Sequence, residues 1–216
     1  MIWLSEKIEF PAPETATKDG IIALGGDLSA ERLIYAYQHG IFPWFSEEDP
    51  IVWYCPSKRM VLDPKEIRIS KSMRKLMKDP CFSISENTVF DQVIHTCKTI
   101  RRKEGDGTWI TDDMEEAYLH LHKMGVAKSI EVWYSKDSKV KELVGGLYGI
   151  DLGNGVFCGE SMFSKKSNAS KLGFIYLATQ LSYRLIDCQV YNEHLSSLGA
   201  REILRADFLA LLKTEN

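Results

Sequence analysis

Three polar residues lie in stretches of sequence that are otherwise apolar. Glu160 occurs in "VFCGESMF", and Asp187 and Gln189 alternate along "LIDCQV", so these two side chains are predicted to share one face of a strand. Burying a carboxylate is costly unless it is paired or hydrogen-bonded. The three residues therefore indicate a polar pocket that could position a reacting group. The structural alternative is that Asp187 or Glu160 only binds a backbone amide or a buried cation.

Residue spacing excludes the common covalent and metal-dependent sites. The segment "GESMF" is not G-x-S-x-G, because Phe163 follows Met162, and no Ser or Cys has a His partner by motif. The cysteines and histidines show no metal-ligand spacing, so we expect no metal site, and reduced thiols in a cytoplasmic protein. If the chain is an enzyme, we expect it to work by positioning and electrostatics without a covalent intermediate.

The glycine-rich segment 145–164, "GGLYGIDLGNGVFCGESMFS", narrowly misses a dinucleotide-binding fingerprint. That fingerprint would require glycine where Cys158 stands and a helix afterwards, where the sequence is aromatic and β-branched. Asn154-Gly155 between two apolar runs instead predicts a hairpin with a type I′ turn, in which both central residues have positive φ. Glycines on its strands would let another backbone, or a ligand, approach closely.

Cations and tryptophans suggest contact with nucleic acid, although the net charge is −3. Between residues 58 and 78, eight cations minus two acids leave a local charge of +6, and "TIRRKEG" follows. Such a cluster can neutralise phosphates, whereas a solvated helix face would look the same in sequence. Trp44, Trp53 and Trp109 follow turn-like segments, so they could stack on unpaired bases or simply pack against proline.

Periodicity predicts an irregular part followed by a regular one. The first 62 residues are rich in proline and aromatics, with one helix in 25–40 that Ser29 caps and Gly40 ends. Further helices are predicted in 68–78, 88–101, 111–125, 168–183 and 205–214, and strands in 127–135, 142–152, 156–163 and 185–192. We expect an α+β or α/β chain with a small N-terminal domain, 1–62, and a C-terminal domain, 63–216, around a mixed sheet. No run of about 18 apolar residues predicts a membrane span, and the N-terminus lacks the features of a secretory signal.

Ten segments, in order, resemble one family, the bacterial leucyl/phenylalanyl-tRNA–protein transferases. They run from residue 10 to 208 and are "FPAPETA", "GIIALGGDLSAERLIYAYQHGIFPWF", "PIVWYCPSKRMVL", "GTWIT", "AYLHLHKMGVAKSIEVW", "LVGGLYGIDLG", "FCGESMFS", "NASK", "LIDCQV" and "HLSSLGAREILRADF". The resemblance implies a C-terminal domain with the N-acetyltransferase (GNAT-like) fold. It also implies transfer of leucine or phenylalanine from charged tRNA to the N-terminal arginine or lysine of a protein, which marks that protein for degradation.

The resemblance further implies roles for individual residues. Glu160, Asp187 and Gln189 match active-site positions, and Trp44 and Trp109 match positions that hold the 3′-terminal adenosine of tRNA. The residues that match the hydrophobic pocket for the transferred side chain are Leu147, Phe157, Phe174, Leu177, Leu181 and Ile186. From the basic cluster, the residues expected to contact the tRNA backbone are Lys58, Arg59, Lys71, Arg74 and Lys75. No cofactor, metal or membrane is required, and we expect a monomer.

An aminoacyl ester is already activated, so the expected task of the site is orientation and charge stabilisation. We expect Asp187 to orient Gln189, whose side-chain carbonyl accepts a hydrogen bond from the attacking amine, and Glu160 to attract the positive charge of the acceptor. A second hypothesis makes Asp187 the general base. Three alternative functions stay open: leucine transfer to N-terminal Asp or Glu, a CoA-dependent acetyltransferase, and an RNA-binding module. The sequence lacks the pyrophosphate loop of the acetyltransferase, and the RNA-binding module leaves the polar residues without a role.

Overall fold

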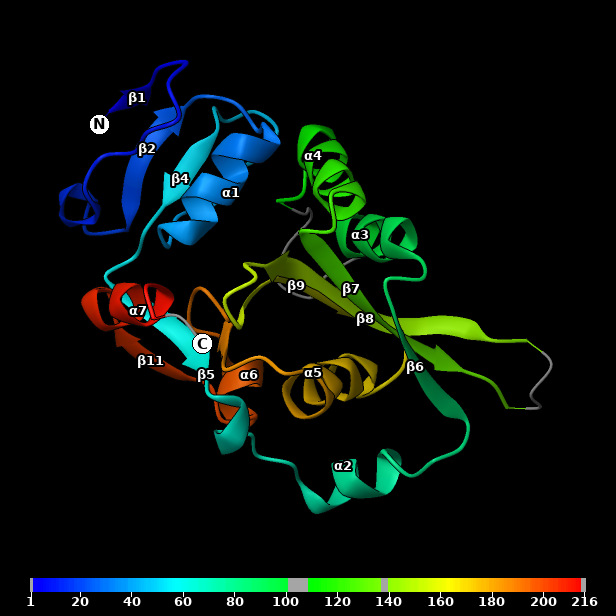
Figure 1. Cartoon of the computed structure of the whole chain (residues 1–216). Helices are drawn as coiled ribbons and strands as arrows, with labels where there is room; N and C mark the ends of the chain where they lie inside the picture. The colour runs from blue at the N-terminus through cyan, green and yellow to red at the C-terminus, as the bar shows by residue number, and fades with distance from the viewer. Residues whose placement is uncertain (1, 101–108, 137–139, 215–216) are drawn as a thin grey trace.

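The computed structural model describes residues 2–100, 109–136 and 140–214, which form two β-sheets with helices around them (Figure 1). The α-helices of this part are α1 (Ala30–Gln38), α2 (Lys71–Leu76), α3 (Phe90–Thr99), α4 (Asp112–Lys123), α5 (Ala169–Gln180), α6 (Glu193–Ser197) and α7 (Arg205–Leu212). All the predicted helices are present, and α6 was not predicted. None of the described helices is long and apolar enough to cross a bilayer. The cations Arg101, Arg102 and Lys103 of "TIRRKEG" lie outside the described residues.

The smaller sheet is built from the first 54 residues, with strand order β1-β2-β4-β3. Its strands are β1 (Trp3–Leu4), β2 (Ile21–Gly25), β3 (Phe42–Pro43) and β4 (Val52–Tyr54). Helix α1 connects β2 to β3 and is capped, as predicted, by Ser29, whose side chain accepts a hydrogen bond from Arg32 N. After the helix, Gly40 adopts the left-handed conformation with φ of 73°, so α1 ends where the sequence predicts.

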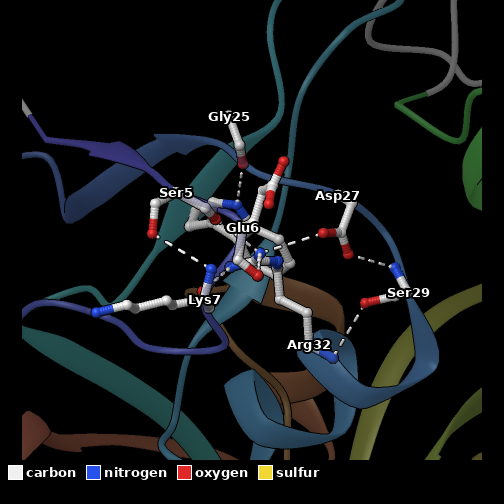
Figure 2. Close-up of polar contacts among 8 residues, drawn as sticks. Ser5, Glu6, Lys7, Gly25, Asp27, Ser29 and Arg32 are labelled. Carbon is white, nitrogen blue, oxygen red and sulfur yellow. Dashed lines mark hydrogen bonds and ion pairs between the residues drawn. The ribbon is translucent and has the colours of Figure 1, made fainter.

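A buried arginine fastens the start of the chain to α1 (Figure 2). Arg32 is completely buried, and its guanidinium donates to the carbonyl oxygens of Ser5 at 2.9 Å and Lys7 at 3.1 Å. It also pairs with Asp27 at 3.1 Å. These acceptors compensate the buried charge at both terminal nitrogens, because an unpaired charge would cost several kcal/mol. These contacts therefore hold the N-terminal segment against α1.

The larger sheet has seven strands in the order β11-β5-β10-β9-β8-β7-β6. They are β5 (Lys58–Leu62), β6 (Phe82–Glu86), β7 (Ala127–Tyr134), β8 (Glu142–Asp151), β9 (Val156–Ser164), β10 (Leu185–Asp187) and β11 (Arg201–Leu204). β9 and β10 are parallel and the other pairs are antiparallel, so the predicted mixed sheet is confirmed. β5 pairs with β10 and β11 in this sheet, whereas the predicted division places residues 58–62 in the N-terminal domain.

Helices cover both faces of the larger sheet (Figure 1). α3 and α4 pack on one face, and α5 packs on the other, with α2 beside it. The hydrophobic core on the α3 and α4 side continues into the smaller sheet, because Trp53 and Leu33 belong to the same buried cluster as Ile94. The two sheets are thus held together by a shared core, which allows side chains from both to meet.

The glycine-rich hairpin is present, but its turn differs from the predicted one. β8 and β9 pair antiparallel, yet positive φ occurs at Gly153 and Gly155 and not at Asn154, so the type I′ prediction was wrong. A β-carbon on Gly145 would lie 2.6 Å from the side chain of Ala169, at the start of α5. One on Gly149 would lie 2.2 Å from a backbone oxygen of β9. These glycines therefore make room for neighbouring protein.

Strand β10 is shorter than the predicted 185–192. It ends at Asp187, and the chain then departs from regular extended structure, with φ of 61° at Gln189. Met60 on β5 contacts both sides of this irregularity, since its carbonyl accepts from Cys188 N and its N–H donates to Gln189 O. Gln189 is consequently not placed by strand alternation.

Candidate active site

A cavity of about 620 Å³ opens where β9 continues beyond its partner β10. Its lining comes from the segment around β3, from Trp109 before α4, from β8, β9 and α5, and from the chain after β10. Among the predicted site residues, the cavity brings together Trp44, Trp109, Leu147, Phe157, Glu160, Phe174, Leu177, Asp187 and Gln189. Residues that are up to 145 positions apart in sequence, from 44 to 189, thus share one space.

Asp187 is completely buried and has a cation as its partner. Arg59, on β5, donates from Nε to Asp187 Oδ1 at 2.8 Å and from Nη2 to Oδ2 at 2.7 Å. Burial acts to lower the pKa of the Arg59 guanidinium, but the nearby Asp187 carboxylate outweighs it and raises that pKa above its ordinary value. The bidentate geometry fixes the orientation of the carboxylate as well as its charge.

Gln189 is held at both its backbone and its side chain. Its N–H donates to Asp187 Oδ1 at 2.9 Å, which supports a left-handed conformation that is uncommon for residues other than glycine. Its side-chain Nε2 donates to Glu160 Oε1 at 2.7 Å. The amide oxygen makes no hydrogen bond to any described residue, and Gln189 lines the cavity, so this oxygen is the end of the amide left for a ligand.

Glu160, on β9, is only 9% exposed and is surrounded by neutral hydrogen-bond donors. Its Oε2 accepts from the hydroxyl of Tyr118 on α4 at 3.1 Å, and Tyr118 is hydrogen-bonded to the hydroxyl of Tyr37 on α1. Burial raises the pKa of Glu160 to about 7, although hydrogen bonding by the two tyrosines acts to lower it. The carboxyl group therefore changes its protonation state near neutral pH.

The two tyrosines were missed in the sequence. Tyr37 and Tyr118 are both fully buried, and burial followed by the nearby Glu160 carboxylate raises the pKa of both phenols well above the ordinary value. Each lies on the apolar face of an amphipathic helix, where an aromatic residue predicts only core packing. No local pattern marks a hydroxyl pair formed by residues 81 positions apart.

The apolar wall of the cavity includes most of the predicted side-chain pocket. Leu147, Phe157, Phe174 and Leu177 are buried and line it. The structure places two predicted members elsewhere. Ile186 is buried in the same apolar cluster behind this lining. Leu181 lines a second cavity of about 440 Å³, which shares Phe157 and Leu177 with the first.

The three tryptophans considered for base stacking differ in exposure. Trp44 is 43% exposed, with its ring centroid 5.7 Å from that of Tyr54, and Trp109 is partly buried. Both line the cavity. Trp53 is completely buried, and its indole donates to Gly25 O at 2.8 Å, so for this residue packing is the correct interpretation.

The cations predicted to contact the tRNA backbone do not form one group. Lys71, Arg74 and Lys75 are exposed on α2, and Lys58 is exposed at the start of β5. Arg59 points the other way, because successive side chains of a strand face opposite sides. It is 1% exposed and engaged by Asp187, so it is not available to a phosphate at the surface.

Two further groups of the cavity could react in principle. Cys188 follows Asp187, and burial raises the pKa of its thiol, which therefore stays protonated rather than forming a nucleophilic thiolate. His194, on α6, has a lowered pKa because of burial and the charge of Lys171. Within the described ranges, no three His, Cys, Asp or Glu side chains are grouped as metal ligands would be.

Comparison with known proteins identifies the family of the chain. A family model described as leucyl/phenylalanyl-tRNA protein transferase matches residues 61–213, and the model of its N-terminal domain matches residues 26–57. A curated leucyl/phenylalanyl-tRNA–protein transferase of Flavobacterium johnsoniae is 53% identical, with full coverage of both chains. Another, from Syntrophus aciditrophicus, is 50% identical over 97% of this chain and 87% of its own.

A solved structure shares the fold without close sequence similarity. FemX aligns with a TM-score of 0.50 and 9% identity, over 86% of this chain and 71% of its own. This likeness fits the predicted fold class, a small N-terminal domain with a GNAT-like domain around a mixed sheet. The family models and the curated relatives establish that the chain belongs to the leucyl/phenylalanyl-tRNA–protein transferase family and is an aminoacyltransferase that acts on proteins.

Proposed function

We propose that this enzyme, acting in the cytoplasm, transfers leucine or phenylalanine from tRNA to proteins that begin with arginine or lysine, and so marks them for degradation. The observation that supports this most is the composition of the 620 Å³ cavity. An apolar wall, two tryptophans and a hydrogen-bonded polar group of Glu160, Gln189 and Asp187 all line it. These are the parts needed to hold an apolar side chain, a terminal base and an attacking amine together.

The apolar wall suits the transferred side chain. Leu147, Phe157, Phe174 and Leu177 offer no polar group that a branched or aromatic hydrocarbon would leave unpaired. An apolar pocket separates side chains that differ by one methylene by only about 1–3 kcal/mol. Leucine and phenylalanine should both be accepted, whereas side chains branched at the β-carbon should be excluded by shape.

The two tryptophans and α2 would bind the tRNA. Trp44 and Trp109 both line the cavity, where an unpaired terminal adenosine could stack on either indole. The exposed cations Lys71, Arg74 and Lys75 on α2 would contact backbone phosphates. Proteins read single-stranded RNA ends more readily than A-form grooves, so such contacts suffice without base readout elsewhere.

Chemistry at the polar group requires orientation more than activation. The acceptor nitrogen attacks the ester carbonyl carbon, the ester C–O bond breaks, and the ribose oxygen leaves with a proton while the nitrogen loses one. An α-amino group with an ordinary pKa of about 7.7–8.0 is already partly neutral at pH 7. The free amide oxygen of Gln189 would accept a hydrogen bond from this amine, because Glu160 already occupies its Nε2.

Glu160 would attract the cationic acceptor and take up a proton. Its pKa of about 7 means that the incoming positive charge favours the carboxylate form, and the same group can accept a proton as the peptide bond forms. This negative charge also favours an N-terminal arginine or lysine over the alternative acceptors, aspartate and glutamate. Asp187 orients Gln189 through the backbone hydrogen bond at 2.9 Å.

Transfer of labelled leucine and phenylalanine from charged tRNA tests the proposal directly. Four reporter proteins that differ only in their first residue, Arg, Lys, Asp or Gly, are compared, and acetyl-CoA is added in a separate reaction. We expect label on the Arg and Lys reporters only, and no acetylation. Label on the Asp reporter alone would establish the acidic-acceptor alternative, and equal label on all four would refute selection by Glu160.

A further inference from the structure

We propose that Arg59 is a positioning residue of this transferase, which holds Asp187 and the Trp44 segment in a fixed relation and keeps Asp187 out of proton transfer. The inference rests on the proposed function, because it assigns Arg59 to the reaction in the cavity. It departs from the sequence prediction that Arg59 contacts a tRNA phosphate. It also decides between the two roles considered for Asp187.

Both oxygens of the Asp187 carboxylate accept hydrogen bonds. Oδ1 accepts from Arg59 Nε at 2.8 Å and from Gln189 N at 2.9 Å, and Oδ2 accepts from Arg59 Nη2 at 2.7 Å. Both charged groups are buried, with 1% exposure for Arg59 and none for Asp187. A carboxylate held this way by a bidentate arginine is an orienting group, since taking up a proton would break a buried ion pair.

The contacts on the other side of Arg59 reach the smaller sheet and the last helix. Nη1 donates to Gly40 O at 3.1 Å, just after α1. The guanidinium carbon lies 4.5 Å from the ring centroid of Phe42 and 4.7 Å from that of Phe208 on α7. An arginine between two aromatic faces is fixed in place by cation–π attraction. Phe42 is two residues from Trp44, so one side chain connects the adenosine side of the cavity with its catalytic side.

Among the ionisable groups near Asp187, Arg59 supplies the compensating positive charge. Glu160 and the thiols of Cys158 and Cys188 are the other ionisable groups that act with Asp187, and each is acidic or neutral. Arg59 is therefore the cation that offsets these groups. Without it, Asp187 would be a buried carboxylate beside another acid, with no ion-pair partner.

Four variants test this assignment: Arg59→Met, Arg59→Lys, Asp187→Asn and the double variant Arg59→Met/Asp187→Asn. Leucine transfer is measured from pH 5 to 9. We expect Arg59→Met to lower kcat about 100-fold, because misplaced reacting groups cost about that much, and to raise KM for charged tRNA by less. The pH profile of Arg59→Met should show an additional ionisation that is absent from the wild-type profile. This ionisation should also be absent from the profile of the double variant. Arg59→Lys, which keeps the charge, should recover part of kcat without the added ionisation.

Arg32→Met is the matched control, because Arg32 is also fully buried and ion-paired but lies outside the cavity. It should lower the Tm without changing the pH profile. If Arg59→Met fails to fold, the double variant and Arg59→Lys carry the test, together with the pH dependence of their Tm. A wild-type pH profile in Arg59→Met would overturn the proposal. So would a loss of the wild-type pH dependence in Asp187→Asn, which would make Asp187 the base. A wild-type enzyme that transfers nothing would instead refute the proposed function.

Discussion

Replacing Glu160 with glutamine should stabilise the protein above neutral pH and slow transfer. The carboxyl group is buried, and its hydrogen-bond donors, Tyr118 and Gln189, carry no charge. Its pKa is about 7 in the folded protein, against an ordinary value of 4.5, chiefly because of burial. An acid whose pKa is raised by folding stabilises the folded state at low pH. That contribution is lost as the pH rises from about 4.5 through about 7.

The size of the effect follows from the difference between these two pKa values. About 2.5 pH units separate 7 from 4.5, and 1.36 kcal/mol per unit gives about 3 kcal/mol. Glutamine has nearly the same size, can still accept from Gln189 and donate to Tyr118, and does not ionise. The free energy of unfolding of Glu160→Gln should therefore exceed that of the wild type by up to about 3 kcal/mol at pH 8, and by little at pH 4.5.

Urea unfolding followed by tryptophan fluorescence measures this difference at pH 4.5, 6, 7 and 8. Glu47→Gln, at an exposed position, is the control and should show no such trend. Leucine transfer by Glu160→Gln should fall by about 100-fold, the usual contribution of a proton-transfer group. A stability difference that does not change with pH would refute the reasoning on burial. Full activity of the variant would show that Glu160 takes no part in transfer.

Three further predictions concern the tRNA and the hairpin. Trp44→Ala should raise KM for charged tRNA about tenfold or more through lost stacking, whereas Trp3→Ala, exposed but outside the cavity, should not. Lys71→Ala should reduce the log–log salt slope of tRNA binding by about 0.7–0.9; an unchanged slope in filter binding would exclude this contact. Gly146→Val should lower the Tm, because its β-carbon would lie 2.9 Å from Phe163, with a cost of about 1–3 kcal/mol; calorimetry showing an unchanged Tm would contradict this.

The elements that the sequence predicts well are those with a strong local signal. Ser29 and Thr111 accept the capping hydrogen bonds of α1 and α4, and both helices show the periodic apolar face expected of them. The short strands β5, β6 and β11 were not predicted, since β-pairing with distant residues decides them. The turn at Asn154 differs because the loop is longer than two residues, and its glycines take the positive φ values.

The residues of the candidate site also differ in how well local sequence predicts them. Glu160 and Asp187 could be found because a carboxylate in an apolar strand requires a partner. The cation that pairs with Asp187 could not be found, since Arg59 lies 128 positions away and near the start of a basic run that suggests a surface. Gln189 was selected by strand alternation, yet its place depends on a left-handed residue after the strand ends. Sequence identified the groups that need compensation, and only the fold showed what compensates them.

The two carboxylates of the cavity illustrate why such compensation decides function. Asp187 faces a bidentate arginine and a backbone N–H, so its carboxylate is held by an ion pair in one orientation. Glu160 faces a phenol and an amide, both neutral, so its surroundings favour neither state strongly near pH 7. Differing environments that separate two neighbouring acids commonly assign them different tasks. Here Asp187, held by Arg59, can orient Gln189. Glu160, with a pKa of about 7, can respond to an arriving cation and then accept its proton. Because the ester is already activated, its reaction needs an orienting group and a proton acceptor but no stronger base.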